Sequence, residues 1–245
     1  MMSNRFYQFN DNVFIEESID IKANVCRYMN FSKLLYLLDR KFYIGLKCNF
    51  SDRRENADLY NPFLKHLTVS GEPISNELVR KREEAIKEYK DISANIYASC
   101  WNLDKNENYL MWKSYTSNDI GICIESTVEG ILESLSYDEY VVYIGKMNYH
   151  SEIIHPDVIS YLFHKEKYYK GENELRFYFK SKNCQYNGDD VYLECNPQLL
   201  INKIKYSPYM NSGTKKLVTN LLIHKYDYLK NRISSSKILE SNNNL

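Results

Sequence analysis

The feature that most constrains the fold is the way strand-like and helix-like segments intermix along the chain without a sustained β-α-β rhythm. From Asn95 onward, much of the sequence alternates between apolar and polar residues with the period of two that is typical of strands. Helix-like segments interrupt these strands, and neither a repeat nor a linker-like stretch divides the chain. This order predicts a single α+β domain with a mixed, mostly antiparallel sheet flanked by helices.

The predicted domain covers residues 25–239. The polar, aperiodic residues 1–24 predict an irregular N-terminal arm, and the asparagine-rich residues 240–245 predict a frayed tail. Predicted strands cover 25–28, 42–46, 96–100, 121–125, 141–144, 175–180, 191–195 and 204–206. Predicted helical segments cover 31–38, 75–89, 110–115, 128–135, a stretch after Pro156 that Gly171 ends, a short turn from 197, and 217–226.

Composition excludes several classes of protein. The 32 basic and 32 acidic residues cancel, so there is no basic surplus of the kind that drives binding to nucleic acid. No apolar run approaches the roughly 20 residues that span a bilayer, and the N-terminus lacks the apolar region of a signal peptide. We therefore expect a cytoplasmic protein with no membrane partner. The 23 tyrosines suit half-buried strands and ligand-lined clefts, with strand packing favoured.

Cysteines and histidines give no indication of a metal site. The six cysteines include no C-x-x-C pair, and the five histidines are dispersed. We expect neither a disulfide framework nor a bound metal. The sequence also contains no phosphate-binding glycine loop, nucleophile elbow or zinc-protease motif.

Glu172 and Glu174 form the first candidate site. Two carboxylates two residues apart at the start of a strand point to the same face, so each can shift the pKa of the other and both can contact a ligand. Such a pair suits hydrogen bonds to sugar hydroxyls and the stabilisation of an oxocarbenium-like transition state. The alternative is an acidic turn that pairs with Lys170 and Arg176, and the spacing alone favours this alternative.

Trp112 and Arg27 supply the other candidates. Trp112, with Tyr115 beside it and Ser114 or Ser117 as a hydroxyl, would form one wall of a pocket, although a buried packing anchor is the more usual role of tryptophan. Arg27, on a strand before a helix, would bind a phosphate through two hydrogen bonds. A surface ion pair is the alternative role for Arg27.

Six short motifs follow one another along the chain in a fixed order. They are an arginine-tyrosine strand with a leucine helix, a phenylalanine-x-aspartate loop, a serine-cysteine-aromatic strand, a methionine-tryptophan-x-x-tyrosine segment, a glycine-x-cysteine-isoleucine strand and a glutamate-x-glutamate-x-arginine strand, at residues 27–38, 50–55, 99–101, 111–115, 121–124 and 172–176. In these motifs the chain resembles the bacterial domain-of-unknown-function family twenty-nine seventy-one, over about residues 25–239. It departs from the family at Ser51 and Arg53 in the loop.

Two further departures concern histidines. Ser114 and Asp119 stand where histidines are common in the family, so no histidine role carries over to this chain. The resemblance implies a bacterial protein and gives no reaction.

A second resemblance, at the level of the fold, is to mono-ADP-ribosyltransferases. It rests on the order of an arginine-bearing strand and helix, a central serine-bearing strand, and a Glu-x-Glu pair that enters a strand. The resemblance implies that Arg27 holds a phosphate of NAD, Ser99 supports the pocket, Glu174 binds the nicotinamide ribose and Glu172 orients the acceptor.

Two hypotheses about function follow. The first is an NAD-consuming transferase or glycohydrolase, acting as an effector of phage defence or as a toxin. NAD would be its substrate, a protein or nucleic acid its acceptor, and Trp112 and Tyr115 would line the NAD pocket. The second is a non-enzymatic sensor or interaction module, in which Glu174 is ion-paired and Trp112 is buried.

Overall fold

The fold is mixed α+β, and most of its strand pairings are antiparallel. The computed structural model describes residues 5–50, 76–104, 106–116, 120–149, 159, 162–183 and 191–238. Among the described strands, β2 (Val13–Glu16) runs parallel to β7 (Tyr140–Lys146), and β10 (Lys203–Tyr206) runs parallel to β11 (Ile233–Ser235). The other pairings with a described register are antiparallel. The predicted fold class is therefore confirmed.

Contacts within the chain group it into two units, each built from three separate segments. Unit 1 comprises Met1–Ile19, Ile44–Ser99 and Tyr137–Val191, and unit 2 comprises Asp20–Tyr43, Cys100–Ser136 and Tyr192–Leu245. Strands β4 (Lys41–Leu46) and β5 (Ile96–Asn102) contribute residues to both units. The single domain over 25–239 stays a prediction, and each unit is described by itself.

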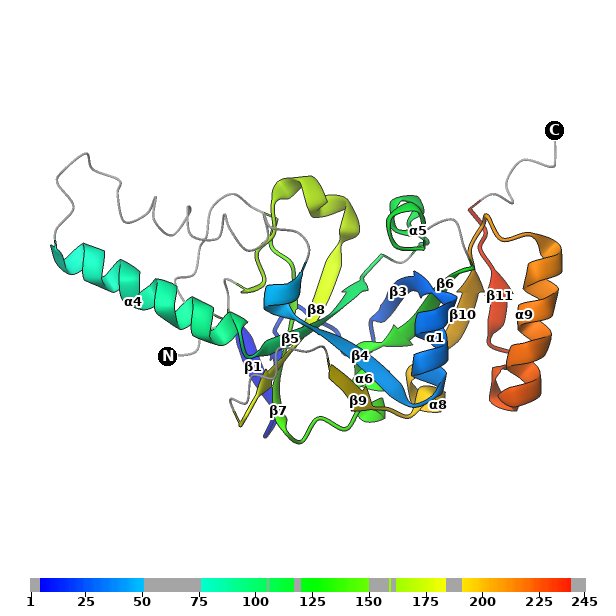
Figure 1. The fold of residues 1–245 in the computed structure, drawn as a ribbon, viewed down its shortest axis with the longest axis horizontal. Coiled ribbons are helices and arrows are strands. Elements are labelled where there is room, and N and C mark those ends of the chain that lie inside the picture. The colour runs from blue at the N-terminus through cyan, green and yellow to red at the C-terminus, as the bar shows by residue number, and fades with distance from the viewer. Residues whose placement is uncertain are drawn as a thin grey trace. The chain divides into compact units, whose positions relative to one another are not determined.

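Unit 1 is organised around the pairing of β7 with β8 (Glu174–Ser181). This pairing extends without a break from Tyr140↔Ser181 to Lys146↔Leu175, and Figure 1 shows the two strands with β5 near them. The strand order in this unit is β1-β2-β7-β8-β5, and β4 pairs with β5. Its helical elements are the 3₁₀ turns Lys47–Asn49 and Lys167–Glu172 and helix α4 (Asn76–Ser93). The core of the unit packs apolar residues of β5 and β7 against Phe163 and Tyr178.

The predicted irregular arm is wrong for two segments of residues 1–24. Strands β1 (Phe6–Asn10) and β2 form an antiparallel pair, and the amide of Asn12 donates to Oδ1 of Asn10 at 2.9 Å in the turn between them. Val13 and Ile15 of β2 are fully buried. Two buried side chains in a strand of four residues give too short an alternation to stand out from a polar sequence.

The segment before β8 also differs from the prediction. Residues 150–158, where a helix is predicted to begin, lie outside the described residues. Residues 163–166 are not helical, and the chain then forms the 3₁₀ turn over Lys167–Glu172. This turn ends at Asn173, whose φ of 39° is left-handed, and Gly171 lies within the turn. Asparagine tolerates this conformation better than most residues, so it takes the role that the sequence assigned to glycine.

Unit 2 contains β3 (Asn24–Asn30), β6 (Gly121–Thr127), β10 and β11 in that order. The end of β5 pairs with β3 at Asn102↔Cys26, and β9 (Val191–Glu194) pairs with β4. The α-helices of this unit are α1 (Phe31–Leu38), α5 (Tyr109–Tyr115), α6 (Val128–Ser134), α8 (Pro197–Leu200) and α9 (Ser212–Lys225), and a 3₁₀ turn covers Asp227–Leu229. Figure 1 shows α9 beside β10 and β11, and a 2.8 Å hydrogen bond joins the hydroxyls of Tyr206 and Thr219 there.

Side chains fix where the helices of unit 2 begin. The Asn108 side chain accepts from the amides of Leu110 and Met111 at the start of α5, and Asn211 accepts from the amide of Thr214 at the start of α9. These bonds satisfy amides that have no partner within the helix. The sequence predicts α9 from its apolar spacing, but its first turn is polar, so the predicted start at 217 comes too late.

Gly121, at the start of β6, is required by close packing. A Cβ atom at this position would lie 2.6 Å from Cβ of Thr116, just after α5, and 3.0 Å from Cβ of Ser207. The methionine-tryptophan helix and the glycine-x-cysteine strand therefore occur together because one packs directly against the other. No described helix is long and apolar enough to cross a membrane.

Candidate functional site

Glu172 and Glu174 lie in unit 1 and share a buried lysine. Nζ of Lys165 donates to Oε2 of Glu172 at 2.6 Å and to Oε2 of Glu174 at 3.2 Å. The backbone amide of Glu174 donates to the Tyr149 hydroxyl at 2.9 Å. The structure thus brings the two predicted carboxylates to one lysine, although Glu172 ends the 3₁₀ turn and the left-handed Asn173 separates it from β8, so strand alternation is not what places them.

Arg176 completes this network from the same face of β8. Its Nε donates to Oε1 of Glu174, its Nη2 donates to Oε2 of Glu174 at 3.0 Å, and its Nη1 donates to the Tyr178 hydroxyl at 3.0 Å. The Tyr178 hydroxyl in turn donates to the carbonyl of Leu162 at 2.6 Å. Arg176 is 1% exposed and Glu174 is 5% exposed. A buried carboxylate with both oxygens bound to cations is compensated, so its charge needs no ligand.

Lys165 is the partner that the sequence did not reveal. The alternative to a catalytic pair was an acidic turn that pairs with Lys170 and Arg176. Arg176 does pair with Glu174, but the lysine in the network is Lys165 rather than Lys170. Lys165 lies nine residues before Glu174, and the non-helical residues 163–166 bring it back toward β8. Ser99, the third predicted site residue of unit 1, is fully buried on β5.

Trp112 lies in the core of unit 2. It is 1% exposed, and its ring meets the ring of Tyr28 edge to face, with 4.9 Å between the centroids. Cys26 and Cys123 belong to the same buried cluster. Tyr115, at the end of the same helix, is 45% exposed. The burial of Trp112 and the ion pairing of Glu174 are the two features expected of a non-enzymatic module.

Glu107 joins Trp112 to the residues that follow β11. Its Oε2 accepts from Nε1 of Trp112 at 3.3 Å and from the Ser236 hydroxyl. Its Oε1 accepts from the amide of Lys237 at 3.2 Å and lies 3.4 Å from Nζ of Lys205. Burial alone would raise the pKa of Glu107, but the bonds from Ser236 and Lys237 and the charge of Lys205 together hold it below its usual value.

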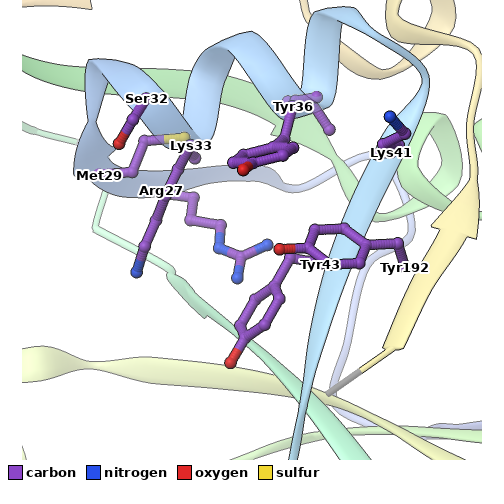
Figure 2. A pocket seen from close by; sticks show the side chains of 9 residues that line it. Arg27, Met29, Ser32, Lys33, Tyr36, Lys41, Tyr43 and Tyr192 are labelled. Carbon is purple, nitrogen blue, oxygen red and sulfur yellow. The ribbon is translucent and has the colours of Figure 1, made fainter. Parts of the chain in front are cut away.

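Arg27 lines a cavity in unit 2 that lies beneath helix α1. Figure 2 shows its side chain reaching from β3 toward the rings of Tyr43 and Tyr192, with Tyr36 extending from α1 toward the same space. The cavity has a volume of about 310 Å³. The residues that line it come from β3, α1, β4 and β9: Arg27, Met29, Ser32, Lys33, Tyr36, Leu37, Lys41, Tyr43 and Tyr192.

The Arg27 guanidinium rests on aromatic rings. Its Cζ lies 5.5 Å from the centroid of the Phe42 ring and 5.8 Å from that of Trp101, and these two buried rings are stacked 12° from parallel. Within the described part of the chain, no carboxylate lies within 4 Å of the guanidinium and no acceptor forms a hydrogen bond with it. Burial lowers the pKa of Arg27, although an arginine remains protonated at physiological pH.

Two lysines add positive charge to the cavity. Nζ of Lys33 lies 6.0 Å from the centroid of the Tyr43 ring, and Nζ of Lys41 lies 2.8 Å from Oδ2 of the exposed Asp39. None of the described residues that line the cavity is acidic. The lining therefore has a surplus of positive charge in a chain whose formal net charge is zero.

Strand alternation explains why Trp112 and Tyr115 do not line this cavity with Arg27. On β3, Arg27 and Met29 face the cavity, while Cys26 and Tyr28 face the Trp112 cluster on the other side. Sequence reasoning found Arg27 but missed the tyrosines and lysines. Lys33 and Tyr36 could have been found on the polar face of the predicted helix 31–38. Tyr192 carries no such signal, because its place depends on the pairing of β9 with β4.

Comparison with known proteins gives no assignment. No family model, curated protein or solved structure matches the chain significantly. The resemblances described from the sequence therefore stay predictions. The described residues include no group of three or more metal-binding side chains.

The network around Glu174 makes a prediction about stability. Glu174→Gln leaves the buried Arg176 and Lys165 without their shared carboxylate, so we expect the free energy of unfolding to fall by about 3 kcal/mol in urea denaturation. Glu194→Gln removes an exposed ion pair with Arg40 and should change it by less than about 1 kcal/mol. A Glu174→Gln protein as stable as wild type would show that the network is not needed for folding.

The lowered pKa of Glu107 makes a prediction about pH. Because its carboxylate is stabilised in the folded state, Glu107 contributes stability above its unfolded pKa of about 4.3, and this contribution is lost as the pH falls through the lower folded value. Glu107→Gln should therefore reduce the free energy of unfolding by about 1–2 kcal/mol at neutral pH and by less in acid. Fluorescence of the two buried tryptophans, Trp101 and Trp112, reports the transition. An equal difference at neutral and at acid pH would contradict the assignment.

Proposed function

We propose that the protein is a non-enzymatic sensor whose unit 2 binds a small phosphate-bearing ligand in the cavity at Arg27. The observation that carries the proposal is the guanidinium of Arg27, which faces a cavity and has no carboxylate partner among the described residues. A positive charge removed from water is unfavourable unless an anion or hydrogen-bond acceptors compensate it. A phosphate supplies both, because its oxygens match the planar donors of an arginine.

The other residues of the cavity support an anionic ligand. Lys33 and Lys41 line it, and no acidic side chain among the described lining residues opposes a phosphate. The stacked rings of Phe42 and Trp101 hold the guanidinium from one side through their faces. Arg27 is therefore positioned before a ligand arrives, which reduces the entropy lost on binding.

NAD is one candidate ligand. In an NAD-consuming enzyme Glu174 would be catalytic, whereas in the proposed sensor it is structural. Both oxygens of Glu174 accept from Arg176 or Lys165 in a buried network. This arrangement supports a structural role for Glu174 and leaves Arg27 as the ligand-binding residue. The resemblance to a bacterial family supports a protein of the bacterial cytoplasm. We propose phage defence as one process in which such a sensor would act.

Binding of pyrophosphate, measured by isothermal titration calorimetry, tests the proposal. We expect wild-type protein to bind it, Arg27→Gln to bind it at least about tenfold more weakly, and Arg27→Lys to fall between them because it keeps the charge but loses the paired donors. Arg80→Gln, which changes an exposed arginine of α4, should bind as wild type does. Circular dichroism confirms that each variant is folded.

Two results would overturn the proposal. The first is the absence of pyrophosphate binding, or binding that is equal in wild type and in folded Arg27→Gln. The second is release of nicotinamide from NAD by wild type that disappears in a folded Glu174→Gln protein, because this would assign catalysis to Glu174.

A further inference from the structure

The cavity at Arg27 has a charged part and an aromatic part. Arg27 is half-buried against Phe42 and Trp101, whereas Tyr36 and Tyr192 are 49% and 48% exposed. A bare phosphate would use the charged part alone. A ligand that uses the whole cavity needs an anionic group and an apolar or planar group joined by a short spacer.

The tyrosines at the exposed side of the cavity form a connected set. The ring centroids of Tyr36 and Tyr192 are 5.5 Å apart, and those of Tyr43 and Tyr192 are 5.6 Å apart. The three residues come from α1, β4 and β9, so separate elements bring their rings together, with a tilt of 36° between Tyr36 and Tyr192 and of 60° between Tyr43 and Tyr192 (Figure 2). Half-exposed rings that support one another offer a surface on which a planar base can stack, and such stacking is common in nucleotide recognition.

The hydroxyl groups in the lining of the cavity suit a sugar. Ser32 and the tyrosines carry hydroxyl groups that both donate and accept hydrogen bonds. A ribose presents hydroxyls of the same kind and separates a base from its phosphate. An anion with an alkyl tail, such as a fatty acid, would place that tail against these hydroxyls and could not form hydrogen bonds with them.

The size of the cavity limits how much of a nucleotide it can hold. Its volume of about 310 Å³ lies at the lower end of the range for small-molecule sites, roughly 300–1,000 Å³. A dinucleotide such as NAD would therefore place only one of its two nucleotide halves inside. Lys41 already contacts Asp39, so the anionic part of the ligand is assigned to Arg27, which has no carboxylate partner among the described residues.

We infer that the ligand is a mononucleotide, with its phosphate at Arg27 and its base stacked on Tyr36 and Tyr192. This inference rests on the proposed function of the same cavity and adds the class of ligand. It also predicts that the adenylate half of NAD is sufficient for binding, because nothing in the cavity requires the nicotinamide half.

Calorimetry with a series of probes tests the inference: pyrophosphate, ribose 5-phosphate, adenosine and AMP. We expect AMP to bind at least about tenfold more tightly than ribose 5-phosphate, because of base stacking, and more tightly than adenosine, because of the phosphate. Tyr36→Leu and Tyr192→Leu should weaken AMP binding several-fold more than they weaken pyrophosphate binding. Tyr36→Phe, which keeps the ring and loses only the hydroxyl, should weaken AMP binding less than Tyr36→Leu does.

The outcomes separate the inference from the proposed function. If pyrophosphate binds through Arg27 while AMP binds no more tightly than ribose 5-phosphate, the proposed anion-binding function is supported and the inference of a mononucleotide ligand is wrong. If Tyr36→Leu and Tyr192→Leu bind AMP as wild type does, the base does not stack on these rings. If no probe binds in a way that depends on Arg27, both the function and the inference fail.

Discussion

Each unit contains an arginine that is largely removed from water, and the way its charge is compensated decides what the residues around it can do. In unit 1, Glu174 accepts hydrogen bonds from Arg176 through both of its oxygens, so the pair is complete without a ligand. In unit 2, Arg27 rests on Phe42 and Trp101, whose faces attract a cation but supply no negative charge. In the proposed function, the carboxylates that looked catalytic in the sequence are structural partners, and Arg27 is the residue that binds the ligand.

The twofold alternation of side chains along a strand produces both arrangements. On β8, Glu174, Arg176 and Tyr178 lie two residues apart on one face. The sequence itself therefore places the carboxylate, the guanidinium and the hydroxyl within hydrogen-bonding distance of one another. On β3, successive residues serve different purposes, since Arg27 faces the cavity and Tyr28 packs against Trp112. One strand therefore links the core of unit 2 to its candidate site.

Local patterns predicted much of the fold but little of the site. Strands β3 to β10 and helix α1 have clear apolar spacing, and most lie where the sequence places them, whereas β1, β2 and β11 are too short for their alternation to be recognised. Glu172 and Glu174 were predicted to share a strand face, but Glu172 lies in the 3₁₀ turn before β8, and the two carboxylates meet through Lys165 instead. Lys165 and Tyr192 were not foreseen, because their positions depend on a non-helical segment and on the pairing of β9 with β4, which no local pattern encodes.

The central claim is that the Arg27 guanidinium binds the phosphate of a ligand. Nuclear magnetic resonance of the Nε–H group of this arginine, assigned through its loss in Arg27→Lys, observes that contact directly. The account predicts that adding AMP shifts this resonance and protects the proton from exchange with water, while the Nε–H group of Arg176 is unaffected. An Arg27 resonance that does not change when AMP saturates the protein would contradict the account.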